Sequence, residues 1–426
     1  MLQAARHSGV ADRQAVFEVF ARSLPAGRRY GVFAGTGRLL ERIADFRFQS
    51  NDLEFLATNN VVDSETLNWL ANYKFSGNIS GYREGEIYFG YSPVLTVEAS
   101  FAEAVVLETL VLSVLNFDTA VASAAARMKS AAAGRNLAEM GSRRVSEIAA
   151  VAAARAAYIA GFAATSNLEA GRSWNIPTMG TAAHAFTLMH DTEEAAFRAQ
   201  IETFGTATTL LIDTYNIEAG VRKAIEVAGP ELGAVRIDSG DLAIEIAKVR
   251  ALLDDLGAKN TKITVTNDLD EYAIAALAAA PVNSYGVGTS VATGSGAPTA
   301  GFVYKLVSHQ QPGGDWVNVA KTSAQKANIA GRKTAVRRHD AQGIATAEIV
   351  HSQIAGAPQS KNDSTESLNE RNLIVELMNL GIAVEEFVGP EGTLNARNHH
   401  AKVIAALPAQ ALRLTRGEPG ISTLLS

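Results

Sequence analysis

The first hundred residues alternate between segments with strand-like and helix-like hydrophobic patterns. Residues 14–22 (QAVFEVFAR) are rich in β-branched and aromatic side chains, and residues 29–34 resume that pattern after a Pro-Ala-Gly turn, which predicts a β-hairpin. Two more short strands are expected within residues 79–98, separated by a turn at Arg83–Glu86. The segments between these strands have the spacing of short helices: 36–46, 52–58 and 64–72.

The middle of the chain has a different rhythm, in which short apolar strands alternate with helices. Residues 101–133 predict two packed helices and residues 144–160 predict a third, all rich in alanine. Apolar strands are then expected near 161–165, 177–180, 208–213, 234–238, 262–267, 283–287 and 302–307. Strands that alternate with helices form right-handed parallel βαβ units. Seven such repeats favour a barrel over an open sheet.

The pattern weakens after residue 308. A loop is expected at 309–316, a linker at 355–365 and a charged helix at 364–381. Basic residues in this region predict a surface face, with contact to a second nucleotide as the alternative: Lys321, Lys326, Arg332, Lys333, Arg337 and Arg338. The whole pattern predicts an α/β protein. It combines an irregular (β/α) barrel at residues 134–308 with an α+β open-faced sandwich domain at residues 1–133, which residues 309–426 complete.

Composition excludes several classes of function. The 426 residues carry 38 lysines and arginines against 44 acidic residues, a net charge of −6, without a basic run. A general binder of nucleic acid or of anionic membranes is therefore not expected. The absence of cysteine excludes disulfides, thiolate metal sites and a cysteine nucleophile. Charged residues interrupt the most apolar stretches and the N-terminus lacks a signal-peptide pattern, so we expect a cytoplasmic protein.

Polar groups follow six successive expected strands. They are Thr165–Asn167, Thr181 with His184, Asp213–Asn216, Arg236–Asp241, Thr266–Asp268 and Tyr285–Ser290. In parallel α/β folds the carboxyl ends of the strands gather at one edge, where ligands bind. Helix capping explains Asp213 or Ser239 taken alone. It does not explain an Arg-x-Asp-Ser-Gly-Asp cluster and a histidine at the same edge, so we expect one polar site there.

Several of these residues allow two interpretations. Gly286-Val287-Gly288-Thr289 is either a loop whose backbone N–H groups bind a phosphate or an ordinary flexible turn, since it matches neither a Walker A motif nor a dinucleotide-binding fingerprint. His184, in the first turn of a helix, is either functional or a structural hydrogen-bond donor. The residues alone indicate a solvated pair at Arg143 and Arg144. Carboxylates suited to holding Mg²⁺ indirectly, through waters and phosphates, are Asp213, Asp238, Asp241 and Asp268.

Together these segments resemble nicotinate phosphoribosyltransferase, a type II phosphoribosyltransferase, in the form typical of actinobacteria. The resemblance runs nearly end to end, and it is specific because the motifs occur in the family's order. The segments that carry it are AVFEVFARSLPAGRRYGVFAGTGRLLE (15–41), GSRR (141–144), TSNLEAG (165–171), GTAAHAF (180–186), LLIDTYN (210–216), VRIDSGDL (235–242), NDLDE (267–271) and YGVGTSVATGSGAPTAGFVYKLV (285–307).

The resemblance implies a reaction and its participants. Members of the family make nicotinate mononucleotide and pyrophosphate from nicotinate and phosphoribosyl pyrophosphate, with Mg²⁺. ATP hydrolysis drives the equilibrium through a phosphohistidine. The resemblance also implies a homodimer with shared active sites.

The same resemblance assigns roles to residues of this chain. His184 matches the phosphorylated histidine, while Thr181 and Arg236 match residues that contact nicotinate. An arginine there suits the nicotinate carboxylate. Asp238 matches a partner for ribose hydroxyls or for the Mg²⁺–pyrophosphate group. The remaining expected substrate-binding residues are Gly286, Gly288 and Thr289 for the 5-phosphate, Arg143 and Arg144 for pyrophosphate or phosphate, and Asn167 and Ser239.

The chain departs from the family pattern at its start. A Thr-Asp-x-Tyr segment, whose tyrosine stacks on nicotinate, normally precedes the stretch that matches Met1–Ala5. Either the start lies upstream or the site lacks this aromatic wall. The alternatives are a nicotinamide or quinolinate phosphoribosyltransferase and a non-catalytic nucleotide-binding paralogue. Arg236 disfavours the neutral amide of nicotinamide, and the second carboxylate of quinolinate calls for a denser basic cluster.

Overall fold

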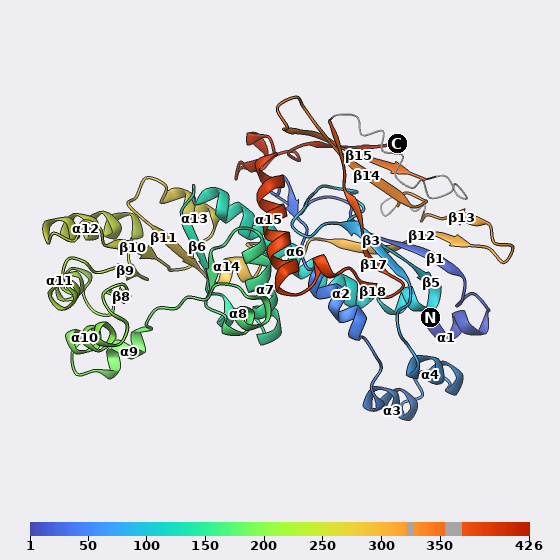
Figure 1. Cartoon of the computed structure of the whole chain (residues 1–426), viewed down its shortest axis with the longest axis horizontal. Coiled ribbons are helices and arrows are strands. Elements are labelled where there is room, and N and C mark those ends of the chain that lie inside the picture. The colour runs from blue at the N-terminus through green and yellow to red at the C-terminus, as the bar shows by residue number, and fades with distance from the viewer. Residues whose placement is uncertain (322–327, 354–368) are drawn as a thin grey trace. The chain divides into compact units, whose positions relative to one another are not determined.

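The computed structural model describes residues 1–321, 328–353 and 369–426 and divides the chain into two compact units. Unit 1 comprises Met1–Ser123 and Ala297–Ser426, and unit 2 comprises Ala124–Gly296. The long helix α6 (Glu108–Ala131) contributes residues to both units (Figure 1). The two ends of the chain therefore fold together, while the middle forms a unit of its own.

Unit 1 is built on a seven-stranded sheet with the order β13-β12-β1-β5-β3-β17-β18, antiparallel throughout. Its strands are β1 (Gln14–Ala21), β3 (Asn78–Tyr82), β5 (Leu95–Ser100), β12 (Phe302–Gln310), β13 (Trp316–Asn318), β17 (Ile374–Asn379) and β18 (Ile382–Ala383). Every residue of β1 except the first is buried, as expected for a strand covered on both faces. The N-terminal strands thus pair directly with strands from the C-terminal third.

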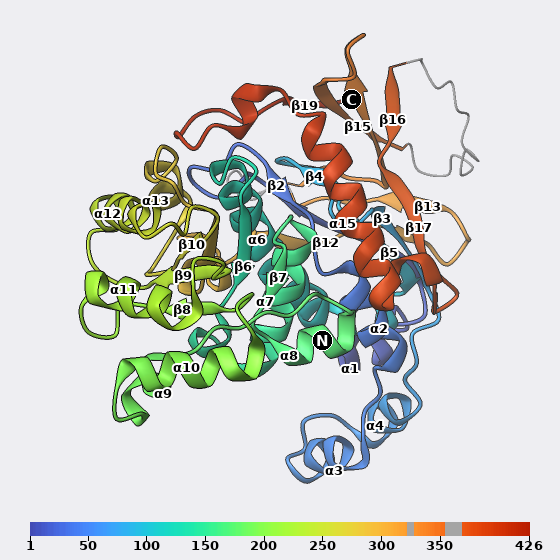
Figure 2. The ribbon, with the colours of Figure 1, turned by 60° about the vertical axis from the view of Figure 1, so that its left-hand side comes forward.

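A second, four-stranded sheet in unit 1 has the order β16-β14-β15-β19. Its strands are β14 (Lys333–His339), β15 (Ala345–Ser352), β16 (Glu370–Asn372) and β19 (Ser422–Leu425), and β2 (Gly31–Val32) pairs separately with β4 (Ile87–Tyr88). Figure 2 shows helix α15 as a long red ribbon in this unit. The helices of unit 1 are α1 (Leu2–His7), α2 (Thr36–Asp45), α3 (Ser50–Thr58), α4 (Ser64–Ala71), α5 (Phe101–Val106) and α15 (Gly389–Ala405), with short 3-10 turns η2 (Glu385–Phe387) and η3 (Ala409–Leu412).

Helix α6 is a core helix. By length and composition it is apolar enough to cross a membrane, but 67% of its most apolar stretch is buried inside the structure. Val111 and Leu115 of α6 belong to the same hydrophobic core as Phe17 of β1, whose ring stacks on Tyr304 with centroids 4.7 Å apart. Burial of this apolar surface against the sheet explains the composition of the helix.

Unit 2 contains a six-stranded, all-parallel sheet with the order β7-β6-β11-β10-β9-β8, half of a barrel. The strands are β6 (Asn136–Glu139), β7 (Ala164–Thr165), β8 (Thr209–Leu211), β9 (Ala234–Ile237), β10 (Lys262–Val265) and β11 (Ser284–Val287). The connecting helices are α7 (Glu147–Ile159), α8 (Leu168–Trp174), α9 (His184–Met189), α10 (Glu193–Phe204), α11 (Ile217–Ala228), α12 (Leu242–Asp255), α13 (Glu271–Ala276) and α14 (Thr289–Ala292), with a 3-10 turn η1 (Ser142–Arg144). The predicted α/β class, an irregular barrel with a sandwich domain, is confirmed.

Several predicted elements differ from the structure. Residues 14–22 and 29–34 do not form a hairpin, because β1 pairs with β5 and β12 while β2 pairs with β4. The segment 302–307 is not a barrel strand but part of β12 in the antiparallel sheet. The segment 177–180 makes only an isolated bridge from Thr178 to Thr165. The sixth parallel strand is β6, which the pattern did not predict.

The C-terminal predictions also need correction. Where the structure describes it, the expected charged helix at 364–381 is strands β16 and β17. The expected linker at 355–365 and Lys326 lie outside the described residues. Short strands carrying charged residues do not have a hydrophobic period that distinguishes them from an exposed helix.

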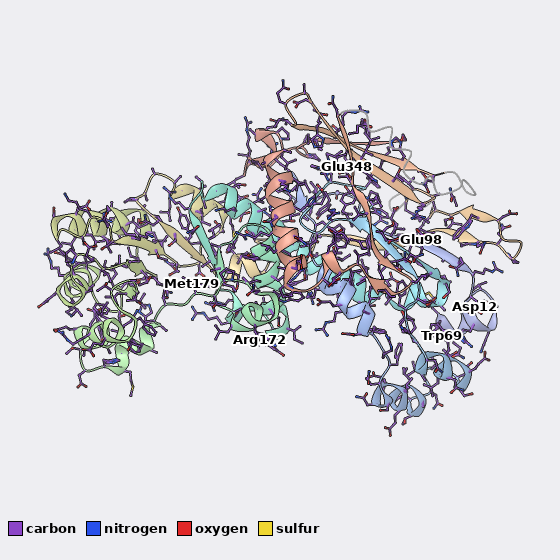
Figure 3. The ribbon with its side chains drawn as sticks, viewed as in Figure 1. Asp12, Trp69, Glu98, Arg172, Met179 and Glu348 are labelled. Atoms are coloured by element: carbon purple, nitrogen blue, oxygen red, sulfur yellow. The ribbon has the colours of Figure 1, made fainter. Side chains whose placement is uncertain are left out.

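The prediction of a basic surface face is wrong for two of its six residues. Lys333 and Arg337 are buried residues of β14, with 4% and 2% of their side chains exposed. Lys333 Nζ donates to Glu18 Oε2 at 2.8 Å, and Arg337 Nη2 donates to Glu348 Oε2 at 2.6 Å. Glu348 lies on β15 (Figure 3). Buried carboxylates on β1 and on β15 make these positions inward-facing, which a count of charges along the sequence does not reveal.

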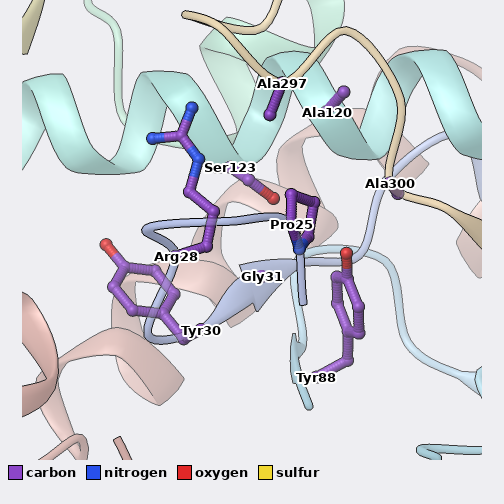
Figure 4. Close-up of a pocket in the computed structure, with 9 residues that line it drawn as sticks. All are labelled: Pro25, Arg28, Tyr30, Gly31, Tyr88, Ala120, Ser123, Ala297 and Ala300. Atoms are coloured by element: carbon purple, nitrogen blue, oxygen red, sulfur yellow. The ribbon is translucent and has the colours of Figure 1, made fainter. Parts of the chain in front are cut away.

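A small cavity in unit 1 lies where the turn before β2 meets α6 (Figure 4). A side chain at Gly31 would place its Cβ 2.1 Å from Cε1 of Tyr88, so only glycine fits there. Ser123 of α6 accepts a hydrogen bond from the Val32 N–H at 2.9 Å. The cavity has a volume of about 10 Å³, enough for a single water molecule. It is a packing gap and not a ligand site.

Replacing Arg337 by alanine should lower the free energy of unfolding by about 3–5 kcal/mol, because Glu348 would keep a buried charge without its cation. The matched control is Arg338→Ala, at the next position of β14, where the side chain is 48% exposed and pairs with Glu370. That change should cost less than about 1 kcal/mol. Urea unfolding followed by circular dichroism measures both, and equal losses in the two variants would contradict the inward-facing assignment.

Candidate active site

The candidate site lies at the carboxyl edge of the parallel sheet of unit 2. Arg236 is the third residue of β9, and Asp238 and Ser239 follow it. Asp213 comes shortly after β8, and Thr266 directly follows β10. Because neighbouring parallel strands end at the same edge, these side chains converge. The polar side chains that the sequence places after these strands therefore lie together, and their role as a ligand site stays a prediction.

Asp213 is the buried centre of this edge. None of its side chain is exposed. Its Oδ2 accepts hydrogen bonds from the backbone N–H of Asp238 at 2.7 Å and from Ser239 Oγ at 2.6 Å. Its Oδ1 is buried and has no hydrogen-bond partner among the residues that the structure describes. A buried carboxylate oxygen without a partner is costly, and it marks a position where a donor or a cation would bind.

His184 faces this carboxylate from the first turn of α9, as predicted. Its Nδ1 lies 3.1 Å from Thr214 Oγ1. Its Nε2 lies 3.9 Å from Asp213 Oδ1 and 3.8 Å from Asp238 Oδ2. The side chain is 39% exposed, so a reactant can reach the ring. The two carboxylates and the Thr214 hydroxyl orient the imidazole ring at this edge.

Arg236 is held by hydrogen bonds from three directions. Its Nη1 donates to Thr181 Oγ1 at 2.7 Å, its Nε donates to Thr266 Oγ1 at 3.0 Å, and its Nη2 lies 3.2 Å from Asp238 Oδ1. Thr266 Oγ1 in turn donates to Asp238 Oδ1. The guanidinium is 12% exposed, so it is positioned in advance and still accessible at one side. A guanidinium fixed in this way suits a planar carboxylate.

The glycine-rich segment begins within β11, at Gly286, and continues through Gly288 into α14 at the neighbouring part of the edge. A Cβ at Gly286 would lie 2.6 Å from Thr266 Cγ2 and 2.7 Å from Met140 Sδ, and one at Gly288 would lie 3.2 Å from the Met140 carbonyl oxygen. Thr289, half-buried, begins α14 directly after Gly288. Close packing on Thr266 and Met140 therefore favours glycine at 286, and phosphate binding by this segment stays a prediction.

Glu139, the last residue of β6, organises the turn that carries Arg143 and Arg144. It is 1% exposed, and burial raises the pKa of its carboxyl group. Thr165 Oγ1 donates to its Oε2 at 2.6 Å, and the Gly141 N–H donates to its Oε1. Arg143 and Arg144 in η1 are exposed, and their guanidinium groups have no partner in the described part of the chain. They are therefore available to an anion.

Asn167 has mainly a structural environment. Its Oδ1 accepts a hydrogen bond from Ala170 N at 2.8 Å and thereby caps α8, and its Nδ2 donates to Ser142 Oγ at 2.9 Å. The capping alternative thus applies to Asn167, and also to Asn216 and Asp241, which cap α11 and α12. It does not apply to Asp213 and Ser239, which bond to each other instead.

The structure brings Thr181, His184, Arg236, Asp238 and Ser239 into one hydrogen-bonded or ion-paired group. Sequence reasoning placed Asp213 and Thr266 at strand ends but did not assign them a supporting role, and it missed Glu139 because β6 was not predicted. Residues 1–321, 328–353 and 369–426 contain no group of three or more histidine, aspartate and glutamate side chains arranged to hold a metal ion.

Comparisons with known proteins agree with this geometry. The nicotinate phosphoribosyltransferase N-terminal domain matches residues 1–116, and the nicotinate phosphoribosyltransferase family matches residues 135–353. A nicotinate phosphoribosyltransferase of Mycobacterium tuberculosis is 53% identical over 431 residues, covering 99% of this chain and 92% of the relative. One from Bacillus subtilis is 37% identical, covering 77% and 69%.

Solved structures show the same fold. The crystal structure of human nicotinic acid phosphoribosyltransferase matches with a TM-score of 0.82 at 24% identity, covering 100% of this chain and 96% of the human one. That of a nicotinate-nucleotide pyrophosphorylase from Pyrococcus furiosus matches with a TM-score of 0.75 at 22% identity, covering 95% and 92%. With family matches over most of its length and a relative 53% identical nearly end to end, the chain belongs to the nicotinate phosphoribosyltransferase family.

Proposed function

We propose that this chain transfers the phosphoribosyl group of phosphoribosyl pyrophosphate to nicotinate, giving nicotinate mononucleotide and pyrophosphate for NAD biosynthesis. The curated relatives that it matches carry this activity in their names. The observation that carries the proposal is the guanidinium of Arg236, fixed by Thr181, Thr266 and Asp238 at the edge where ligands of parallel sheets bind.

Arg236 and Thr181 would select the base. A guanidinium can bind both oxygens of the nicotinate carboxylate, and the Thr181 hydroxyl adds a donor beside it. The neutral amide of nicotinamide offers the guanidinium no negative charge, so it would lose the charge-assisted contact that the nicotinate carboxylate makes. Quinolinate would place a second carboxylate near Asp213 and Asp238, and these acidic groups would repel it.

The phosphoribosyl part would bind along the neighbouring strand ends. Backbone N–H groups of Gly286 and Gly288 and the hydroxyl of Thr289 would hold the 5-phosphate, and the exposed Arg143 and Arg144 would bind pyrophosphate. Asp238, Ser239 and Asn167 would contact the ribose. The expected reaction is displacement at the anomeric carbon through an oxocarbenium-like state, so the protein chiefly positions the reactants and stabilises the departing pyrophosphate.

Mg²⁺ would enter with its phosphate ligands. The described residues offer no preformed site of three or more acidic or histidine ligands, but Asp213 Oδ1 and Asp238 Oδ2 are carboxylate oxygens with capacity left. Mg²⁺ commonly keeps several waters and binds through one or two carboxylates plus substrate phosphates. When bound, it would neutralise the charge of the pyrophosphate group.

ATP coupling would act through His184. An imidazole nitrogen would attack the γ-phosphorus, the N–P bond would form as the bond to ADP breaks, and hydrolysis would later release phosphate. The carboxylates of Asp213 and Asp238, 3.9 and 3.8 Å from Nε2, would stabilise the positive charge that develops on the ring. We further propose a homodimer with shared active sites, working in the cytoplasm.

The central experiment measures mononucleotide formation by the 426-residue chain from phosphoribosyl pyrophosphate and each of three bases. We expect product from nicotinate, more of it with ATP, and none from nicotinamide or quinolinate at the same concentration. A preference for either of the other bases would overturn the carboxylate contact at Arg236. Absence of product from all three would favour a nucleotide-binding protein without catalytic activity.

His184→Ala should abolish the stimulation by ATP and leave slow transfer, because the acceptor of the phosphoryl group is removed while the substrate contacts remain. ATP-dependent initial rates and incorporation of the γ-phosphoryl label into protein measure this. The matched control is His190→Ala, just beyond the other end of α9, where the ring packs on Phe186 and bonds to its carbonyl oxygen. That variant should keep full coupling. Undiminished coupling in His184→Ala would refute the role.

Arg236→Ala should raise the KM for nicotinate on the order of 10- to 100-fold, the loss expected for a charge-assisted hydrogen bond of about 1.5–3 kcal/mol. The KM for phosphoribosyl pyrophosphate should change far less. Arg236→Lys retains the positive charge but cannot bind both carboxylate oxygens at once. Its KM for nicotinate should therefore lie between those of the wild type and of Arg236→Ala. Arg222→Ala, on the exposed face of α11, is the control for loss of an arginine. Equal effects on both substrates would argue against a carboxylate contact.

A further inference from the structure

A second polar cavity, of about 580 Å³, lies entirely in unit 1 and shares no residue with the candidate active site. Its walls come from the turn after β3, from strands β16 and β17 and from helix α15. The volume is within the range of small-molecule sites. Nothing in the proposed transfer reaction uses these elements.

The floor of this cavity is a carboxylate whose charge is already compensated. Glu86 is 1% exposed, and it accepts hydrogen bonds from Arg371 Nη1 and His399 Nε2, both at 2.8 Å, and from the Ile87 N–H at 3.0 Å. Burial acts to raise the pKa of Glu86, but the His399 hydrogen bond and the charges of Arg371 and Arg337 outweigh it and hold the pKa well below its usual value. A saturated carboxylate of this kind adds little repulsion toward an anion.

The walls above the floor supply donors that are not used. The side chain of Arg371 is 37% exposed, and toward the described residues its Nη1 alone forms a side-chain hydrogen bond. Lys402 and Asn398 are exposed and their side chains contact no hydrogen-bond or ion-pair partner in the described ranges. The other carboxylate of the lining, Glu386, already pairs with Arg83 at 3.2 Å. Three cationic side chains therefore face two carboxylates that are both engaged.

Burial is the main cause of the lowered pKa of two histidines, and nearby cations add to it. Burial lowers the pKa of His339, and the charges of Arg371 and Arg337 lower it further. Burial likewise lowers the pKa of His400 to about 4, with contributions from His399 and Arg397. Cations without free carboxylates suit an anionic ligand and disfavour a metal ion.

We propose that this cavity binds a phosphate monoester of mononucleotide size. The phosphate would lie between Arg371 of β16 and Lys402 of α15, with the Asn398 amide as a further donor. Two cations from different elements suit a dianion with three acceptor oxygens better than they suit a single carboxylate. The half-buried Val375 on the same wall offers apolar surface to the organic part of the ligand.

Equilibrium dialysis with radiolabelled inorganic phosphate and with phenyl phosphate tests this proposal. The double variant Arg371→Gln/Lys402→Gln should lose one class of phosphate-binding site, or its affinity there should fall on the order of tenfold. A tenfold fall corresponds to about 1.4 kcal/mol, the size of one net hydrogen bond. The control is Arg222→Gln/Lys248→Gln, which removes the same two charges from exposed positions on α11 and α12. The proposed site would be overturned if the Arg371/Lys402 variant bound phosphate as well as the wild type did. It would also be overturned if the control variant lost as much phosphate binding as that variant.

Two further measurements complete the test. Because Arg371→Gln also removes a partner of Glu86, Lys402→Gln alone serves as the variant that leaves the buried network intact, and it should still weaken phosphate binding.

Crystals soaked in tungstate should show an anomalous peak within hydrogen-bond distance of Arg371 and Lys402, and a soak without such a peak would place the binding elsewhere. Phenyl phosphate should bind more tightly than inorganic phosphate, and equal affinities would overturn the apolar contact with Val375.

Discussion

The buried ion pair between Arg337 and Glu348 is the constraint on which unit 1 depends. Arg337 lies on β14, and it also donates to the Ile87 carbonyl oxygen at 2.8 Å and approaches Glu86 to 3.8 Å. The turn that holds Glu86 also contains Glu84, whose carboxylate accepts the backbone N–H groups of Gly35 and Gly37 at the start of α2. Removing any one charge would leave another buried without its partner. These contacts therefore require the N-terminal and C-terminal segments to fold as one unit.

In unit 2, by contrast, charged groups at the sheet edge are incompletely paired. In unit 1 the buried Arg337 and Lys333 are paired with Glu348 and Glu18, whereas Asp213 retains a buried oxygen without a hydrogen-bond partner among the described residues and Arg143 and Arg144 remain exposed. Protein interiors normally pair such groups. The incomplete pairing at the sheet edge is what the proposed reaction needs, because anionic and cationic parts of the substrates would supply the missing partners. Thr266 and Asp213 hold Arg236, Asp238 and Ser239 in place before any ligand binds, which reduces the ordering cost of catalysis.

Sequence reasoning predicted best where the determining interactions are local. The helices at 36–46, 52–58 and 64–72 correspond to α2, α3 and α4, because caps and hydrophobic spacing act within a few residues. It failed where pairing is distant in the chain. Strand β6 has the sequence Asn-Leu-Ala-Glu, without the β-branched or aromatic residues that mark a strand, and Glu139 was missed with it. The segment 302–307 was assigned to the parallel sheet because an isolated apolar strand does not carry information about its partner.

The amino-acid sequence by itself determined the α/β class, the order of the motifs at the strand ends and the family to which the chain is similar, since these are properties of local pattern and residue identity. The tertiary structure alone decided that Lys333 and Arg337 are buried and that β12 joins β1. It also decided that Asp213, distant in sequence from both, links His184 to Ser239. The physical reason is that burial and charge pairing depend on which strands lie side by side. That choice is made by the energy of the whole packed unit and not by any one segment.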